Sequence, residues 1–224
     1  QGRHAMRIVV DTGGTFTDLV LEDDDGLLHL HKTPSRPDDP AGAVLDAVGV
    51  AASARETTLG ALLSQVEIFV YGTTIATNAV LENTTARSAL LTTQGHPDIL
   101  VMREAGRMGL GRFDWTIPYP DPLVPRDLTF EVPERIDHAG AILTPLNEAA
   151  VVDILADLPG RDVEAIAVSL IWSTANPEHE LAVGRLIERH LPGLPYTLSH
   201  QINPSLREYR RASASALDAS LKPL

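Results

Sequence analysis

The chain has 224 residues, of which 44% are hydrophobic, and this length predicts one or two domains with a buried core. Its formal net charge of −12 disfavours non-specific binding to nucleic acid or an anionic membrane, and no segment approaches the ~18 consecutive apolar residues of a membrane span. Because the chain contains no cysteine, disulfides, thiolate catalysis and cysteine-bound zinc are excluded, and a cytoplasmic location is expected.

The first hundred residues predict a mixed sheet with crossover helices. Short apolar runs rich in β-branched residues predict strands, and apolar residues at helical spacing predict helices. In chain order the expected elements are strands at 7–11, 16–21 and 27–32, a helix at 41–52, a strand at 65–72, a helix at 73–83 and a strand at 88–93. The order is therefore β-β-β-α-β-α-β, antiparallel at the start and parallel afterwards. The leading QGRHA is interpreted as an expression-tag remnant before a native start at Met6.

The rest of the chain predicts an irregular or short-stranded insertion and then a second β-α-β-α unit. Prolines recur between residues 100 and 159 without any sustained period, while scattered aromatic residues supply apolar anchors. The elements expected after this stretch are helices at 147–158, 176–191 and 203–221 and strands at 163–172 and 196–200. The second of these helices is expected to be capped by Asn176, with Pro177 as its first helical residue.

The segment D-T-G-G-T-F-T-D, residues 11–18, directly follows the first expected strand. Asp11 can hold a magnesium ion, which prefers hard oxygen ligands. Gly13 and Gly14 lack a Cβ, so backbone N–H groups can enclose a phosphate. Three further donors are the hydroxyls of Thr12, Thr15 and Thr17. The segment is either such a phosphate-binding hairpin or an ordinary Gly-Gly turn whose threonines favour strands.

The segment YGTTIATNAVLE, residues 71–82, places a glycine and two threonines between a strand and a helix. Helix N–H groups and hydroxyls then lie at the carboxyl end of a strand, where open α/β sheets bind ligands. The candidate substrate contacts are Tyr71, Gly72, Thr73, Thr74 and Asn78. The alternatives are capping of the helix by Thr73 or Thr74 and a buried, hydrogen-bonded Asn78.

Two arginine-rich segments are candidate anion-binding sites. In MREAGRMGLGR the glycines between Arg103 and Arg107 indicate either a mobile anion-binding loop or a solvated one. In REYRR, Arg207 and Arg211 are four residues apart on one helix face and can bind a carboxylate or phosphate, or else form a salt-bridged surface. The Walker, G-x-G-x-x-G, H-E-x-x-H and G-x-S-x-G motifs are absent.

Six ordered segments make the chain resemble the hydantoinase A/5-oxoprolinase family, which includes subunits of acetone and acetophenone carboxylases. The segments are RIVVDTGGTFTDLVL, YGTTIATNAVLE, ALLTTQGHPDIL, VPERIDHAGAILTPL, NPEHE and LREYRRASASALDASLKP. The resemblance covers nearly all of residues 6–224. It implies an actin-like ATPase (ribonuclease H-like) fold in which the D-T-G-G-T hairpin binds the phosphates of ATP together with Mg²⁺.

The resemblance also implies roles for residues and for parts of the chain. Asp11 and Thr15 are expected to be catalytic, Asp11 is expected to hold the metal, and the hairpin is expected to bind ATP. The expected domains are an actin-like subdomain at 6–100, the insertion and second α/β subdomain at 101–199, and the start of a further actin-like domain at 200–224. That further domain, in relatives, holds the second phosphate loop and the adenosine pocket.

The activity implied by the resemblance is ATP-dependent amide hydrolysis. ATP phosphorylates an amide or enolate oxygen, and the product is hydrolysed or carboxylated. We therefore expect an amidohydrolase acting on a small cyclic amide, within an oligomer that contains a hydantoinase B-like partner subunit; this fragment alone is expected to be inactive. The alternatives are a ketone carboxylase subunit, which the REAGR loop and residues 119–136 resemble, and a non-catalytic actin-like module. Tyr71 replaces a histidine found in many relatives, which indicates a different substrate.

Overall fold

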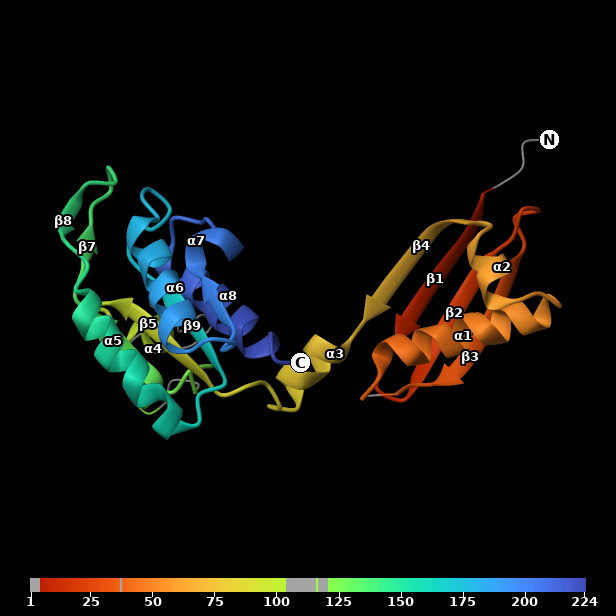
Figure 1. The fold of residues 1–224 in the computed structure, drawn as a ribbon, viewed down its shortest axis with the longest axis horizontal. Helices are drawn as coiled ribbons and strands as arrows, with labels where there is room; N and C mark the ends of the chain where they lie inside the picture. Colours follow the sequence, from red (N-terminus) through yellow and green to blue (C-terminus); the bar gives the residue numbers. More distant parts are fainter. Residues whose placement is uncertain (1–4, 37, 104–115, 117–120) are drawn as a thin grey trace. The chain divides into compact units, whose positions relative to one another are not determined.

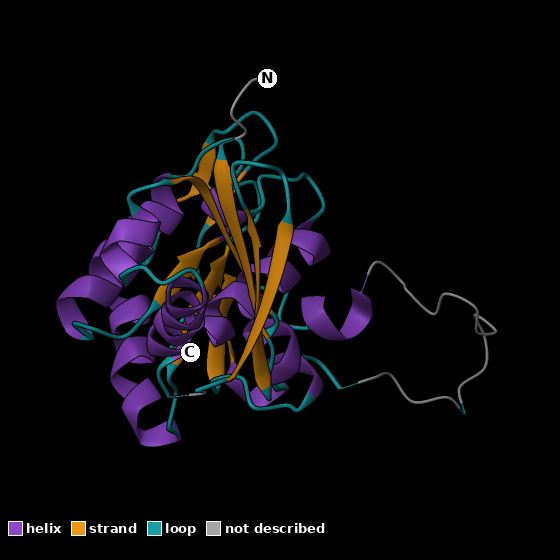
Figure 2. Cartoon of the chain, turned by 90° about the vertical axis from the view of Figure 1, so that its right-hand side faces the viewer, coloured by secondary structure: helices purple, strands orange, loops and turns teal. Residues whose placement is uncertain are grey.

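The computed structural model describes residues 5–36, 38–103, 116 and 121–224. The chain divides into two compact units, the first ending at Thr84 and the second beginning at Thr85. Both units combine helices with strands (Figure 2). This division falls earlier than the boundary expected near residue 100, and residues 200–224 pack within the second unit.

The first unit contains a four-stranded mixed sheet (Figure 1). Its strands, in spatial order, are β3 (Leu28–Pro34), β2 (Phe16–Glu22), β1 (Met6–Thr12) and β4 (Val66–Thr73). β2 pairs antiparallel with both β1 and β3, whereas β4 runs parallel to β1. The predicted change from antiparallel to parallel pairing is therefore confirmed within this sheet.

Two helices cover one face of this sheet, α1 (Pro40–Ala54) and α2 (Leu59–Leu63) (Figure 1). Along β1 buried and exposed residues alternate, so that Ile8 and Val10 pack against α1 while the residues between them face away. α1 begins at Asp39, whose Oδ1 accepts a hydrogen bond from Gly42 N at 2.9 Å. The sequence did not indicate α2, because five residues are too few to show a helical period. After β4 the chain forms α3 (Ile75–Leu81).

The second unit contains a four-stranded sheet in which all neighbours are parallel. Its strands, in spatial order, are β10 (Tyr196–Leu198), β9 (Ala165–Ser169), β5 (Ser88–Thr93) and β6 (Thr129–Val132). β5 therefore does not continue the first sheet, and β6 shows that the predicted insertion supplies a strand. Every residue of β5 and β9 is buried, as is usual for central parallel strands.

Helices pack on this sheet in two groups. α5 (Glu148–Asp157) packs on α6 (Glu178–His190), and α4 (Ile99–Met102) packs on α8 (Glu208–Leu221). Because crossovers between parallel strands are right-handed, α4, which follows β5, lies on one face of the sheet, and α5 and α6 lie on the other. The remaining elements are α7 (Ser199–Ile202), the hairpin of β7 (Arg135–Ile136) and β8 (Ile142–Thr144), and short 3-10 turns at Arg126–Leu128 and Leu158–Arg161.

Two helix starts differ from the prediction. Pro177 occupies the N-cap of α6, and the Asn176 side chain, one residue earlier, accepts a hydrogen bond from Glu178 N at 3.0 Å. The last helix begins at Glu208 rather than near Asn203, because Arg207 at its N-cap is extended with φ −87° and ψ 111°. No helix within the described ranges is long and apolar enough to cross a membrane.

Candidate functional site

The tip of the β1–β2 hairpin consists of Gly14 and Thr15, and Gly13 N donates to Phe16 O at 3.0 Å across it. The favoured two-residue hairpin turns require a left-handed φ, which is the usual reason for glycine in them. None of Gly13, Gly14 and Thr15 has such a φ. A Cβ on Gly14 would meet only Asn78 Nδ2, at 3.6 Å. The φ angles of this turn do not require glycine, and the missing side chain of Gly14 leaves the backbone at the tip accessible.

Two of the three expected hydroxyl donors are used inside the protein. Thr12 is 2% exposed and Thr17 is 0% exposed, because both lie on the buried side of their strands. The Thr17 hydroxyl lies 3.4 Å from that of Thr12 and 3.1 Å from that of Ser35. Ser35 Oγ in turn donates to Gly13 O at 2.8 Å. Thr12 and Thr17 are therefore buried and hydrogen-bonded inside the protein, whereas Thr15 is exposed, and phosphate contact by these threonines stays a prediction.

Asp11 lies on the opposite face of the sheet from α1. It pairs across β1 and β4 with Gly72, and a Cβ on Gly72 would lie 3.7 Å from Asp11 Oδ1. Among the described residues the Asp11 carboxylate has neither a hydrogen bond nor an ion pair, whereas that of its other neighbour, Asp18, pairs with Lys32 at 2.9 Å. Asp11 is thus an exposed, unpaired carboxylate at the end of the strand that leads into the hairpin, and it is suited to a hard cation.

The β4–α3 segment meets the hairpin. Thr73 Oγ1 donates to Thr12 O at 3.3 Å and accepts from Ile75 N, at the start of α3, at 3.2 Å. Capping of this helix by Thr73 was one of the two roles considered for it. Asn78 Nδ2 donates to Thr74 Oγ1 at 3.4 Å. The structure therefore brings Thr73, Thr74 and Asn78 beside the hairpin.

Tyr71 does not join this cluster. It pairs with Val10, on the face of the sheet opposite to Asp11 and Gly72, because successive side chains of a strand point to opposite faces. Its side chain is 44% exposed. A substrate contact by Tyr71 would therefore lie across the sheet from Asp11.

Arg211 is buried rather than on the surface. It is 1% exposed, and its guanidinium donates to Ser199 Oγ at 3.0 Å, Ser205 O at 2.8 Å and Leu170 O at 2.9 Å. Burial lowers the pKa of this guanidinium from its ordinary value. A salt-bridged surface, one of the alternatives considered for Arg211, is therefore wrong, and a substrate contact by Arg211 stays a prediction.

Arg207 and Arg103 have different surroundings from Arg211. Arg207 is exposed and precedes α8, so it does not share a helix face with Arg211. Arg103 follows α4 and is partly buried. Arg107 lies outside the described residues.

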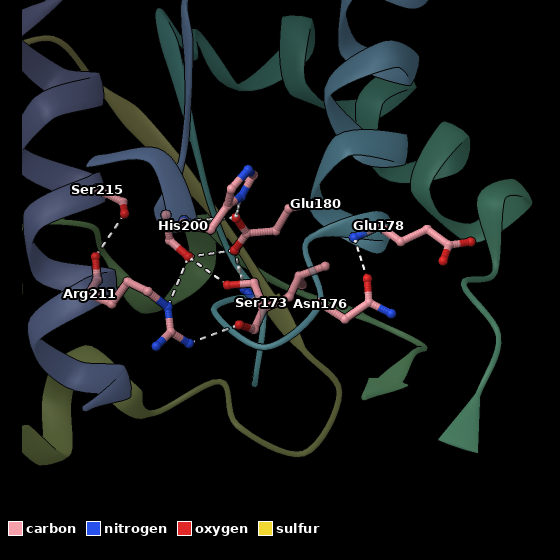
Figure 3. A network of polar contacts seen from close by, with 9 residues as sticks. Ser173, Asn176, Glu178, Glu180, His200, Arg211 and Ser215 are labelled. Atoms are coloured by element: carbon pink, nitrogen blue, oxygen red, sulfur yellow. Dashed lines mark hydrogen bonds and ion pairs between the residues drawn. The ribbon is translucent and has the colours of Figure 1, made fainter. Parts of the chain in front are cut away.

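Glu180 is the centre of a buried network that sequence reasoning missed (Figure 3). Its carboxylate accepts hydrogen bonds from Leu170 N at 2.9 Å, from the Ser199 hydroxyl, and from His200 N at 3.1 Å, and it lies 2.6 Å from His200 Nδ1. The Glu180 side chain is 0% exposed. Its only signal in the sequence was its place in the NPEHE segment.

A second buried carboxylate lies near the carboxyl end of β5. Glu134 accepts from the Thr93 hydroxyl and lies 2.7 Å from His179 Nδ1, and Thr93 Oγ1 accepts from Ile171 N at 2.9 Å. Glu180 directly, and Glu134 through the Thr93 hydroxyl, thus hold the successive backbone N–H groups of Leu170 and Ile171 after β9. The next residue, Trp172, has φ +58°, a backbone conformation that costs energy for a bulky side chain. The hydrogen bonds from Leu170 N and Ile171 N stabilise the turn in this conformation.

Comparison with known proteins identifies the family. Residues 7–191 match the hydantoinase/oxoprolinase N-terminal region, and the chain belongs to this family. It is 35% identical over 222 residues to caprolactamase subunit alpha of Pseudomonas jessenii, covering 99% of this chain and 32% of that protein. It is 38% identical over 226 residues to the acetophenone carboxylase gamma subunit of Aromatoleum aromaticum, covering 96% of this chain and 31% of that subunit. The chain therefore spans about a third of the length of these relatives.

Two solved structures share the fold. A nucleotide-free acetone carboxylase superposes with a TM-score of 0.88 at 29% identity, covering 99% of this chain and 33% of that chain. The ATP-dependent caprolactamase from Pseudomonas jessenii superposes with a TM-score of 0.83 at 35% identity, covering 97% of this chain and 31% of that chain. The expected family and the mixed α/β fold are thereby confirmed.

Proposed function

We propose that this chain is the N-terminal part of an ATP-dependent enzyme that hydrolyses a cyclic amide, and that its β1–β2 hairpin binds the phosphates of ATP. The observation that carries the proposal is the hairpin tip, whose glycines are not required by the turn and leave the backbone open. The related caprolactamase, which is ATP-dependent, supports the nucleotide. The family relationship to caprolactamase and 5-oxoprolinase supports the cyclic amide.

The residues at the tip fit a magnesium-bound phosphate. No described residue accepts a hydrogen bond from Gly14 N or Thr15 N, and the Thr15 side chain is exposed. These groups can donate to phosphate oxygens, and Asp11 offers an unpaired carboxylate to the metal. ATP with Mg²⁺, when bound, supplies the phosphoryl group and neutralises part of its charge. The role of this chain is then to position that group and stabilise charge on its oxygens, which is most of the catalysis in phosphoryl transfer.

The test is a pair of matched substitutions in the full-length enzyme assembled with its partner subunit. Gly14→Ala places a methyl group at the open tip and should weaken ATP binding about tenfold or more, because the backbone can no longer approach a phosphate closely. Gly49→Ala on α1, where a Cβ would meet nothing within 4 Å, is the control and should bind ATP normally. Equal ATP affinity in the two variants would show that the hairpin is not part of the nucleotide site.

A second candidate function is ATP-dependent carboxylation of a ketone. It is favoured by the 38% identity to the acetophenone carboxylase gamma subunit and by the TM-score of 0.88 to acetone carboxylase. ATP hydrolysis that requires both bicarbonate and a ketone would establish this function, whereas hydrolysis that requires only a lactam would establish the first. No ATP-dependent turnover with either substrate class would favour the non-catalytic module.

A further inference from the structure

The second unit has a surface pocket of about 290 Å³ beyond the carboxyl end of β5. The loop after β5, helix α4 and the first turn of α8 form its walls. Pro97, Ile99 and Met102 supply apolar surface, and His96, Arg103 and Tyr209 supply polar groups. Met102 is 62% exposed, so the pocket presents apolar area that a bound molecule would cover.

The topology of the sheet explains why the pocket lies there. From β5 the chain proceeds to β6 on one side, and it later returns to β9 on the other side of β5. The loops that follow β5 and β9 therefore diverge toward opposite faces, which makes this point a topological switch. Open parallel sheets bind ligands outside the carboxyl ends of their strands at such points.

The loop after β5 is held in one shape. Gly95 has φ +87°, a conformation that favours glycine, and His96 N donates to Thr93 O at 3.1 Å to close the turn. Gly95 N donates to Glu131 Oε1 at 2.6 Å. On the far side of the loop Asp98 pairs with Arg126 at 3.0 Å. The pocket wall is thus preformed, and its one carboxylate is already paired.

Three polar groups of the pocket, on Arg103, Tyr209 and His96, can still bind an acceptor. Arg103 Nε is buried and has no hydrogen-bond partner, and among the described residues the Tyr209 hydroxyl has none either. His96 uses at most Nδ1, 3.4 Å from Gln94 O, which leaves Nε2 available. A buried donor without an acceptor is costly, so an acceptor from a bound molecule would stabilise this arrangement.

We propose that this pocket binds the substrate, a small carbonyl compound whose oxygen accepts a hydrogen bond from Arg103 and whose apolar body lies against Pro97, Ile99 and Met102. A volume of about 290 Å³ is at the lower end for ligand sites, which favours a molecule with a single ring. The acceptor oxygen is either a neutral carbonyl or a carboxylate attached to such a ring. That the bound molecule is the substrate rests on the proposed function. That the pocket binds a small carbonyl compound rests on its own donors and apolar walls.

The test measures binding of three probes to the 224-residue chain without ATP. The probes are ε-caprolactam (a neutral lactam), acetophenone (an aryl ketone) and 5-oxoproline (a lactam that carries a carboxylate), each followed by saturation-transfer NMR and titration calorimetry. At least one probe should bind to the wild-type chain. Arg103→Gln should weaken that binding about tenfold or more, as expected for loss of a hydrogen bond from a charged donor. Tyr209→Phe, which keeps the ring, should weaken it less.

The matched control is Arg185→Gln, which removes an exposed arginine on α6 and should leave binding unchanged. Far-UV circular dichroism checks that each variant is folded. If Arg103→Gln does not fold, the comparison of Tyr209→Phe with the wild type still tests the pocket. Preference for ε-caprolactam or acetophenone identifies a neutral carbonyl, and preference for 5-oxoproline identifies the carboxylate. The proposal is overturned if no probe binds to the wild-type chain, or if the pocket variants bind as the wild type does. Because Gly14→Ala lies in the other unit, its effect on ATP tests the hairpin separately.

Discussion

Asp11 and Gly72 lie opposite each other on the parallel strands β1 and β4, and a Cβ on Gly72 would be 3.7 Å from Asp11 Oδ1. The glycine therefore leaves room beside an unpaired carboxylate. The next strand, β2, carries a second carboxylate, Asp18, in register with Asp11 but paired with Lys32. These two aspartates, alike in chemistry and exposure, offer a direct comparison.

Asp11→Asn should reduce Mg²⁺-dependent ATP hydrolysis by about 100-fold or more, because an amide is a poor ligand for magnesium and removes a charge from the site. Asp18→Asn breaks only an exposed ion pair and should change the rate little. Steady-state ATPase assays of the full-length enzyme at several Mg²⁺ concentrations compare the two. Equal losses of activity in both variants would contradict the metal role of Asp11.

Ser35→Ala should destabilise the chain by about 1 kcal/mol, because it removes the hydroxyl that donates to Gly13 O and contacts Thr17. Ser64→Ala removes an exposed hydroxyl that donates to Ala61 O and should have a smaller effect. Urea unfolding of the two variants measures the free energies. A Ser35→Ala variant as stable as the wild type would show that this serine does not hold the hairpin.

Glu180→Gln should destabilise the chain by about 3 kcal/mol, because it removes the negative charge that faces His200 and the buried Arg211. Glu178→Gln, two residues earlier and exposed, is the matched control and should change stability by less than about 0.5 kcal/mol. Thermal and urea denaturation compare the two. If the glutamine variants were equally stable, the network would contribute little through its charge.

Asp23 predicts a pH dependence of stability. The hydrogen bond with His29, and then that from Leu27 N, lower the pKa of the Asp23 carboxyl from 3.8 to about 2. A group whose folded-state pKa is lowered stabilises the fold above its unfolded pKa, and that stability is lost as the pH falls from about 4 toward 2. Asp23→Asn should therefore be less stable than the wild type at pH 6, with the difference shrinking toward pH 2. A difference independent of pH would contradict this origin.

Local patterns predicted much of the first unit. Short apolar runs and the D-T-G-G-T segment indicated a hairpin followed by a parallel strand, and β1, β2 and β4 form that arrangement. The ends of elements were less well predicted. Pro177 rather than Asn176 occupies the α6 cap, because an asparagine followed by a proline can provide its side-chain acceptor from one residue further out.

Contacts between distant residues decided the rest of the candidate site. Thr12 and Thr17 appeared equivalent to Thr15 in the sequence, and only the register of β1 on β2 and the position of Ser35 show that they are buried. Arg211 followed a pattern typical of a surface helix, yet its guanidinium is enclosed by Ser199, Ser205 and Leu170.

The sequence by itself determined the family, the order of most helices and strands, and the presence of a glycine–threonine hairpin, because these depend on residues close together along the chain. The tertiary structure alone decided that β5 joins the second sheet, that Asp11 is unpaired beside Gly72, and that Arg103 lines a pocket with Tyr209. These properties depend on which segments pack together. Strand pairing and burial are set by the total free energy of the fold, to which residues far apart in sequence contribute.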